Sequence, residues 1–251
     1  MSEAKSQKVK PDIRAITRLV SREGNLVQGQ SDLPIDPQLA KEAYEIMAAS
    51  ENHYGGSEGD AGLRKAVAAK VKKYNGIEID IDAKPFELLI TTGGTGALIG
   101  IAQSYLRNKS TLVFEPFYPY HQKIIEEFGG KMEVFTVDED LKFDKAMLAI
   151  QCRQLKDRKE FPLKAIIVCS PSNPSGKVMS RAELEAIAEV AKELDLLVIS
   201  DEVYDSQIWD GDHRPFASLP GMFERTLTVG SLSKSHAMTG SRCGWIVGPV
   251  D

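Results

Sequence analysis

One stretch rich in small and hydroxyl residues organises the chain, and it reads Gly230-Ser231-Leu232-Ser233-Lys234-Ser235-His236-Ala237-Met238-Thr239-Gly240-Ser241-Arg242. The β-prone residues 226–229 precede it and deliver a single lysine, Lys234, into the segment. Burial near other cations lowers the pKa of a lysine enough for its amine to form a Schiff base with a carbonyl. Hydroxyls donate hydrogen bonds and a guanidinium matches phosphate, so Ser231, Ser233 and Arg242 suit an anion. Lysine chemistry beside a phosphate indicates pyridoxal phosphate, although a lone S-x-S-K is most often an ordinary surface lysine.

The composition is typical of a soluble globular protein, with 42% hydrophobic and 27% charged residues among 251. A net charge of −5 gives no general attraction to nucleic acid or to an anionic membrane. The three cysteines are widely spaced and form no C-x-x-C pair, which indicates neither a disulfide framework nor a zinc or other metal site. The N-terminus has no apolar signal region, and no apolar run is long enough to span a bilayer. We therefore expect a soluble, cytoplasmic protein that acts on small molecules.

Predicted strands and helices alternate from about residue 88 to residue 249. This alternation predicts an α/β fold with three layers, α/β/α, around a mostly parallel central sheet. A capping box at Ser180 and Glu183 is expected to begin one of the helices. Residues 138–163 are rich in charge and low in periodicity, and we interpret them as a solvated face. The expected strands are 88–92, 111–114, 132–137, 164–169, 196–200, 226–229 and 244–248.

A glycine-rich turn, Gly93-Gly94-Thr95-Gly96, joins the first of these strands directly to a helix. Glycines at a helix N-terminus expose free N–H groups, and the helix dipole favours an anion there. The signal is weak alone, because similar turns also cradle nucleotides. The pattern G-x-x-x-x-G-K-[ST] is absent, which argues against a P-loop.

Polar residues follow the ends of two other predicted strands, where ligands of parallel α/β sheets collect. Asn173 can donate its amide hydrogen to an oxyanion. Asp201 can pair with a protonated pyridine nitrogen and make the ring an electron sink, although an acidic residue often simply ends a strand. Aromatic residues between two prolines are placed to line a pocket, with core packing as the alternative for Phe117 and Tyr120.

The N-terminal quarter contains two further candidates. Residues 52–64 place four glycines after Tyr54, which is typical of a loop with unusual backbone angles. A plain surface loop is an equally good interpretation of this segment alone. Gly29 lies in a turn-rich extended segment. A lone glycine in such a place more often marks a simple bend of the chain than a binding site. Ile13, Ile16 and Val20, which precede Gly29, suggest a short amphipathic helix.

These motifs, from Gly29 to Arg242, resemble in order and separation those of the class I/II aminotransferases, the fold-type I pyridoxal phosphate enzymes. The matching patterns are S-x-S-K with an arginine eight residues on, S-x-N-P-[ST]-G around Asn173 and D-E-x-Y from Asp201 to Tyr204. One departure is Ser241, where close relatives often carry an aromatic residue. The resemblance implies the large domain of the pyridoxal phosphate transferase type I fold.

The resemblance also implies a role for each motif residue. Lys234 forms the Schiff base and acts in catalysis with Asp201 and Tyr204. Tyr118 stacks on the pyridine face, and Tyr54 reaches the cofactor of a partner subunit. The phosphate is held by Gly94, Thr95, Ser231, Ser233 and Arg242. The C3 oxygen is bound by Asn173 and Tyr204, and the substrate by Gly29 and Asn173.

The resemblance further implies domains and a function. We expect residues 1–44 to form an N-terminal arm and a segment associated with a small domain, and residues 45–251 to form the large cofactor-binding domain. The family's C-terminal small domain would lie beyond Asp251, so the chain looks C-terminally truncated. The implied function is an aminotransferase that acts as a homodimer and moves an amino group between an amino acid and a 2-oxo acid. A lyase or synthase of the same fold, such as a carbon–sulfur lyase or an aminocyclopropane carboxylate synthase-like enzyme, and a catalytically idle protein remain alternatives.

Overall fold

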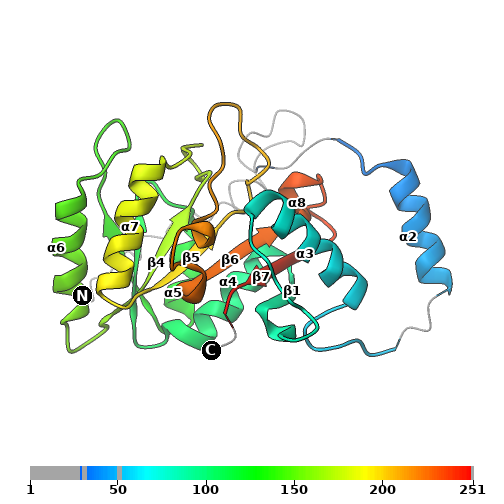
Figure 1. Cartoon of the computed structure of the whole chain (residues 1–251), viewed down its shortest axis with the longest axis horizontal. Helices are drawn as coiled ribbons and strands as arrows, with labels where there is room; N and C mark the ends of the chain where they lie inside the picture. The colour runs from blue at the N-terminus through cyan, green and yellow to red at the C-terminus, as the bar shows by residue number, and fades with distance from the viewer. Residues whose placement is uncertain (1–28, 30–32, 50–52, 250–251) are drawn as a thin grey trace, which may run out of the picture. The chain divides into compact units, whose positions relative to one another are not determined.

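The computed structural model of the protein describes residues 29, 33–49 and 53–249 (Figure 1). The chain divides into two units, Met1–Pro34 and Ile35–Asp251, and all the elements described below belong to the second. The helix expected around Ile13 to Val20 lies outside the described residues. None of the helices in the described part of the chain has the length and apolar character needed to cross a membrane.

A seven-stranded sheet forms the centre of the second unit. Five neighbouring strands pair in parallel, and β7 pairs antiparallel with both β1 and β6. The mostly parallel sheet expected from the sequence is therefore confirmed. In sheet order, the strands are β1 (Leu88–Thr92), β7 (Cys243–Val247), β6 (Thr226–Ser231), β5 (Leu197–Asp201), β4 (Leu163–Cys169), β2 (Ser110–Phe114) and β3 (Lys131–Phe135).

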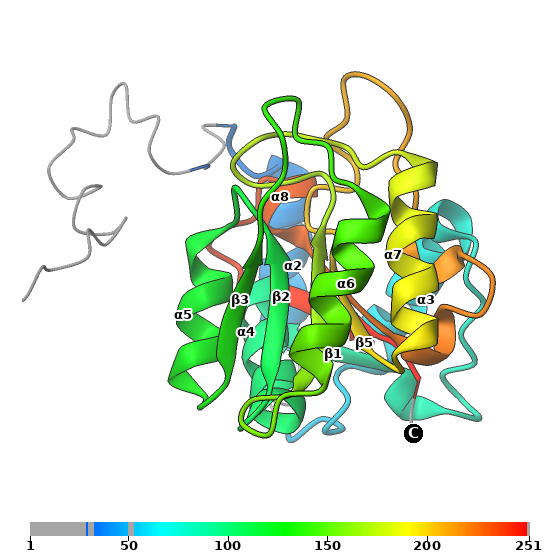
Figure 2. The same cartoon turned by 90° about the vertical axis from the view of Figure 1, so that its left-hand side faces the viewer.

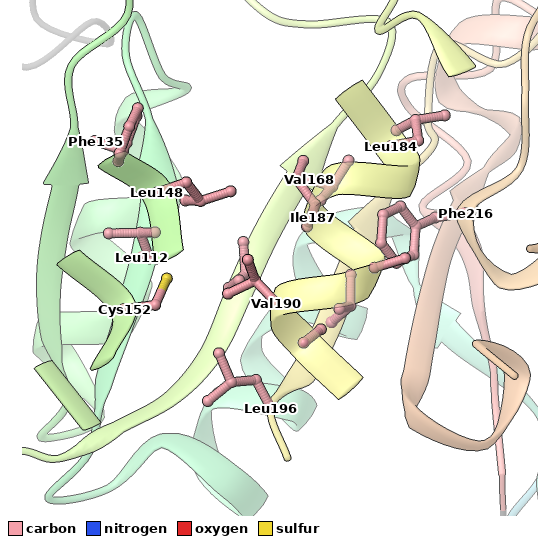
Figure 3. Packing of buried hydrophobic residues seen from close by; sticks show 14 of the residues in the cluster. Leu112, Phe135, Leu148, Cys152, Val168, Leu184, Ile187, Val190, Leu196 and Phe216 are labelled. Carbon is pink, nitrogen blue, oxygen red and sulfur yellow. The ribbon is translucent and has the colours of Figure 1, made fainter. Parts of the chain in front are cut away.

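Helices cover both faces of this sheet, because its inner strands are apolar on both sides. On one face, α6 (Lys145–Lys156) and α7 (Arg181–Glu193) pack on β2, β4 and β5 (Figures 2 and 3). On the other face, α4 (Gly93–Ile101) and α5 (Pro119–Glu127) pack on β2, β4 and β6. A third cluster joins α3 (Ala61–Asn75) to β1 and β7. The three-layer α/β/α architecture is confirmed.

The interpretation of residues 138–163 as a solvated face is wrong, because α6 lies within them. Leu148, Cys152 and Leu155 recur at helical spacing and are buried. The sequence therefore contained the apolar stripe of a helix, although charged residues surround it. Figure 3 shows Leu148 and Cys152 facing the sheet near Leu112 of β2. Asp144 begins the helix, and its side chain accepts a hydrogen bond from the N–H of Met147 at 2.9 Å.

Other helix ends follow the local sequence. The capping box at Ser180 and Glu183 is present at the start of α7, as expected. The helix α2 (Pro37–Ala49) begins at Pro37, a residue type favoured in the first turn of a helix, and all its residues are exposed. The helix α4 begins at Gly93, four residues before the apolar run from Ala97 that marks it in the sequence. Five further helical segments are short: η1 (Pro85–Glu87), η2 (Ala102–Leu106), η3 (Phe216–Ser218), η4 (Phe223–Arg225) and α8 (Leu232–Ser235).

Candidate active site

The site residues expected on four different strands and loops gather at one edge of the sheet. Parallel pairing brings the carboxyl ends of β4, β5 and β6 together, and Cys169 pairs with Asp201 in the register of β4 and β5. β7 enters the sheet at this same edge, because Ser231 pairs with Gly244. The helix α4 also begins here, since β1 ends at Thr92 opposite Cys243. Asn173, Asp201, Tyr204 and Lys234 therefore follow strands that all end at one edge.

The N-terminus of α4 forms an open backbone surface at this edge. Thr92 supplies no side-chain cap, so the first N–H groups of the helix are not satisfied by their N-cap residue. Gly93 has a φ of 68°, and a Cβ there would lie 2.5 Å from Nη2 of Arg242. A Cβ on Gly94 would lie 3.8 Å from the Cβ of Ser231. Thr95 is half-buried in the first turn. The Arg242 guanidinium thus lies next to the N-terminus of α4. A positive charge beside free N–H groups is the arrangement that binds an anion.

The two serines of the S-x-S-K motif differ in their contacts. The Ser231 hydroxyl donates to the carbonyl oxygen of Cys243 at 3.1 Å and accepts from the N–H of Ser233 at 3.1 Å. It therefore caps α8 and ties β6 to β7. Ser233 Oγ accepts a hydrogen bond from Nη1 of Arg242 at 3.4 Å, which leaves its own proton available to an anion. Arg242 also donates to the carbonyl of Thr239 at 2.9 Å.

Asp201 lies at the end of β5 and is almost completely buried. Its Oδ2 lies 2.8 Å from Nε2 of His121, and the two side chains are 5% and 1% exposed. Sequence reasoning missed His121 as a site residue. The available signal was its position in the first turn of a helix that follows a buried strand, three residues after Tyr118. A buried carboxylate paired with an imidazole is suited to hold a cationic ring nitrogen.

A phenol and an amide lie beside this carboxylate. Nδ2 of Asn173 donates to the Tyr204 hydroxyl at 3.4 Å. Burial raises the pKa of Tyr204, and the charge of Asp201 adds to the effect, so the phenol keeps its proton and remains a donor. Burial also raises the pKa of the Cys169 thiol far above its ordinary range. Asn173 and Tyr204 can together bind one oxyanion.

Lys234 lies half-buried in the short helix α8, which directly follows β6 (Figure 1). Burial lowers the pKa of Lys234, which raises the neutral fraction of its amine. Its Nζ lies 5.7 Å from the centre of the Tyr204 ring. Nε2 of Gln207 donates to the Lys234 carbonyl oxygen at 3.2 Å. This is the environment that a nucleophilic lysine requires.

Tyr118 lies at the start of α5, next to the buried pair. Its ring meets that of His121 edge-on, with centres 5.4 Å apart and planes at 88°. It stacks on Tyr120 at 5.3 Å and 21°. Tyr54, by contrast, is fully exposed, and no contact seen among the described residues brings it to the site. Gly29 belongs to the other unit, so its role in substrate binding stays a prediction.

The donor set fits pyridoxal phosphate. The α4 N-terminus, Arg242 and Ser233 match a phosphate dianion, and the buried Asp201 matches a protonated pyridine nitrogen. Asn173 and Tyr204 match the oxygen at C3. The amine of Lys234 matches the aldehyde.

Comparison with known proteins agrees with this chemistry. The chain is 37% identical over 224 residues to an aspartate aminotransferase of Pyrococcus abyssi, covering 88% of this chain and 55% of that protein. It is 33% identical over 240 residues to an arginine–pyruvate transaminase of Pseudomonas aeruginosa, covering 94% of this chain and 59% of that protein. The chain thus spans little more than half the length of these relatives.

Solved structures agree as well. The aspartate aminotransferase of Thermus thermophilus with maleate superposes with a TM-score of 0.83 at 28% identity, over 96% of this chain and 62% of that one. The N-succinyldiaminopimelate aminotransferase of Mycobacterium tuberculosis gives a TM-score of 0.80 at 33% identity, over 88% and 56% of the two chains. A model of the family described as aminotransferase class I and II matches residues 23–251. The chain belongs to the class I and II aminotransferases, a family of pyridoxal phosphate enzymes.

Proposed function

We propose that this chain carries the cofactor site of an aminotransferase that moves an amino group between an amino acid and a 2-oxo acid. One observation carries the proposal: Lys234, with a lowered pKa, lies over the Tyr204 ring at the edge of the sheet that also holds Asp201. The named relatives act on arginine, aspartate, N-succinyldiaminopimelate or kynurenine. Amino acids in general are therefore the proposed substrate class.

The N-terminus of α4 anchors the cofactor phosphate in this proposal. Gly94 and Thr95 present backbone N–H groups, and the Thr95 hydroxyl lies in the same turn. Arg242 supplies the positive charge, while Ser231 holds α8 in place and Ser233 donates its hydroxyl proton. A dianion held by several charge-assisted hydrogen bonds fixes the orientation of the rest of the molecule.

Asp201 and its neighbours act on the ring of the bound cofactor. When bound, pyridoxal phosphate supplies a ring that takes up the electron pair left as a proton leaves the substrate α-carbon. The Asp201 carboxylate holds the proton on the ring nitrogen, and His121 fixes the orientation of that carboxylate. Asn173 and Tyr204 hydrogen-bond the C3 oxygen, and Tyr118 packs against the ring face.

Lys234 performs both covalent and proton-transfer chemistry. Its amine would hold the cofactor at its aldehyde carbon, and the lowered pKa keeps more of that amine in the neutral, nucleophilic form. With cofactor and substrate bound, the neutral Nζ would be a base that accepts the proton of the substrate α-carbon. The Tyr204 ring and the Gln207 amide restrict where this lysine can lie.

The quaternary structure, domains and location form part of the same proposal. We take residues 1–44 as an arm and a segment of the small domain, residues 45–251 as the cofactor-binding domain, and the cytoplasm as the location. In a symmetric homodimer, the exposed Tyr54 would reach the phosphate in the partner subunit. Light scattering, together with cofactor titration of Tyr54→Phe, checks this arrangement. A monomer with unchanged cofactor affinity in that variant would contradict it.

Product analysis tests the activity. The purified protein is loaded with pyridoxal phosphate, and a visible absorbance band reports binding. It is then mixed with a panel of amino acids and 2-oxo acids, and products are identified by mass spectrometry. Paired formation of a new 2-oxo acid and a new amino acid supports the proposal. Elimination or cyclised products would instead assign a lyase or synthase, and bound cofactor without products would assign an idle protein.

A further inference from the structure

Glu202 is a buried carboxylate that lies between two site residues, Asp201 and Tyr204, and has no role in the chemistry above. It is only 2% exposed, and its backbone N–H donates to the carbonyl of Val229 in β6. A buried carboxylate is stable only where hydrogen bonds or opposite charges compensate its lost hydration. Its contacts therefore reveal what it holds together.

The carboxylate of Glu202 accepts four hydrogen bonds. Oε1 accepts from the hydroxyl of Ser200 at 2.8 Å and from the N–H of Phe216 at 3.1 Å. Oε2 lies 3.0 Å from Nδ2 of Asn75 and 3.0 Å from Nε2 of His213. These four donors come from β5, η3, the last residue of α3 and the loop before η3. Every usual acceptor position of the carboxylate is occupied.

These contacts close a loop at its base. The chain leaves the end of β5 at Glu202 and enters η3 at Phe216, so Glu202 joins the start of the loop 202–216 to its end. His213 binds the same carboxylate from within the loop, and Asn75 attaches that point to α3. A second attachment to α3 is the ion pair of Asp205 with Lys70.

The loop that Glu202 closes contacts Lys234 through two residues. The Tyr204 ring lies beneath Nζ of Lys234, with 5.7 Å between that atom and the ring centre. The side-chain amide of Gln207 donates to the Lys234 carbonyl at 3.2 Å. Part of the burial of Lys234 is therefore supplied by a loop whose own position depends on Glu202.

We propose that Glu202 is a positioning residue, which closes the loop 202–216 and thereby sets Tyr204 and Gln207 against Lys234. The consequence for catalysis rests on the proposed function, whereas the effect on the loop and on Lys234 does not. Replacing this carboxylate by an amide puts an NH2 group, which cannot accept a hydrogen bond, in the place of an oxygen that accepts two. The loop then loosens at its base, and Lys234 becomes more hydrated.

The test compares Glu202→Gln with the matched control Glu87→Gln. Glu87 is also buried, at 5% exposure, but it precedes β1 and pairs with Lys84 outside the loop. In the cofactor-free protein, the pH dependence of Lys234 labelling by an amine reagent is followed by mass spectrometry, together with hydrogen exchange of residues 203–215. For Glu202→Gln we expect a higher labelling midpoint and faster loop exchange. Affinity for pyridoxal phosphate should weaken about tenfold, the scale of one buried charged hydrogen bond. The control should change none of these.

One result separates a positioning role of Glu202 from a role in stability alone. A lower melting temperature with unchanged Lys234 labelling and unchanged loop exchange would overturn the proposal. If Glu202→Gln does not fold, His213→Phe removes one donor to Oε2 and is scored by the same measurements. If the unaltered protein binds the cofactor but converts no amino acid, the proposed function fails. The labelling and exchange data still decide the role of Glu202 in that case.

Discussion

Nε2 of His121 lies 2.8 Å from Oδ2 of Asp201, and both side chains are nearly excluded from water. The pair joins the first turn of α5 to the end of β5, two elements that are 80 residues apart in the chain. Tyr118 packs edge-on against the same imidazole. The histidine thus orients the carboxylate and the aromatic ring that the cofactor would meet.

We expect His121→Phe to reduce the transamination rate strongly while preserving the fold. The phenyl ring fills a similar volume, but Asp201 loses a buried hydrogen bond worth about 1–3 kcal/mol, which corresponds to a loss in rate of about 5-fold to 150-fold. Rates of the half-reaction with one amino acid, measured beside thermal unfolding, check this. Asp201→Asn, which removes the charge itself, serves as the comparison and should be slower still. A His121→Phe enzyme with an unchanged rate would refute the positioning role.

Lys234 should titrate below the ordinary lysine range. Burial lowers its pKa in the folded protein, so the unfolded chain binds the proton more tightly. Stability should therefore rise with pH across the window between the lowered pKa and the ordinary value of 10.5. The measurement is the rate of amine labelling at Lys234 against pH, with the exposed Lys41 as an internal control. Equal midpoints for the two lysines would contradict the effect of burial.

Much of the fold could be predicted because its strands are short apolar runs separated by turns. Ile166, Ile167 and Val168 lie in such a run, and β4 occupies it. Local motifs led to the candidate site, since Asp201 ends a strand and Asn173 and Lys234 lie within four residues of the end of one. The residues His121 and Glu202 were harder to find. Their roles depend on partners 80 and 127 residues away, and no local pattern reports such contacts.

The helix α6 was missed for a different reason. Residues 138–163 include twelve charged side chains, but only three of them lie within α6, and the charged segments on both sides of the helix concealed its apolar face. Leu148, Cys152 and Leu155 are spaced by four and three residues, which is the spacing of a helix face. The helix is held by this narrow stripe and by ion pairs such as Arg153 with Glu193 of α7.

Leu148→Ala should lower the free energy of unfolding far more than Met147→Ala, the same change at the preceding residue. Leu148 is fully buried against Leu112 and Phe135 (Figure 3), so its truncation leaves a cavity that costs about 2–5 kcal/mol. Met147 is 57% exposed, and Met147→Ala should change the free energy of unfolding by less than about 1 kcal/mol. Urea unfolding of both variants provides the comparison. Similar losses for the two would mean that α6 does not pack on the sheet as described.

Gly244→Ala should disturb the fold and the anion site together. A Cβ at this position would lie 2.5 Å from the carbonyl carbon of Gly93, 2.7 Å from the nitrogen of Gly94 and 2.9 Å from the oxygen of Gly230. All three are backbone atoms, so no side chain can move aside, and β7 must shift away from β6 and from the start of α4. We expect a loss of about 1–3 kcal/mol in stability, the usual range for overpacking a close contact.

The matched control for Gly244→Ala is Gly100→Ala, in the interior of α4. A Cβ there meets no atom within 4 Å, and alanine favours a helix over glycine by about 1 kcal/mol, so this variant should be more stable than the parent. Because Gly244 touches the turn that would hold the phosphate, its variant should also bind pyridoxal phosphate more weakly, whereas Gly100→Ala should bind it normally. Calorimetry and cofactor titration measure the two effects separately. If Gly244→Ala lost neither stability nor affinity, the close approach of β7 to the start of α4 would be ruled out, and with it the anion site formed by Gly93, Gly94 and Arg242.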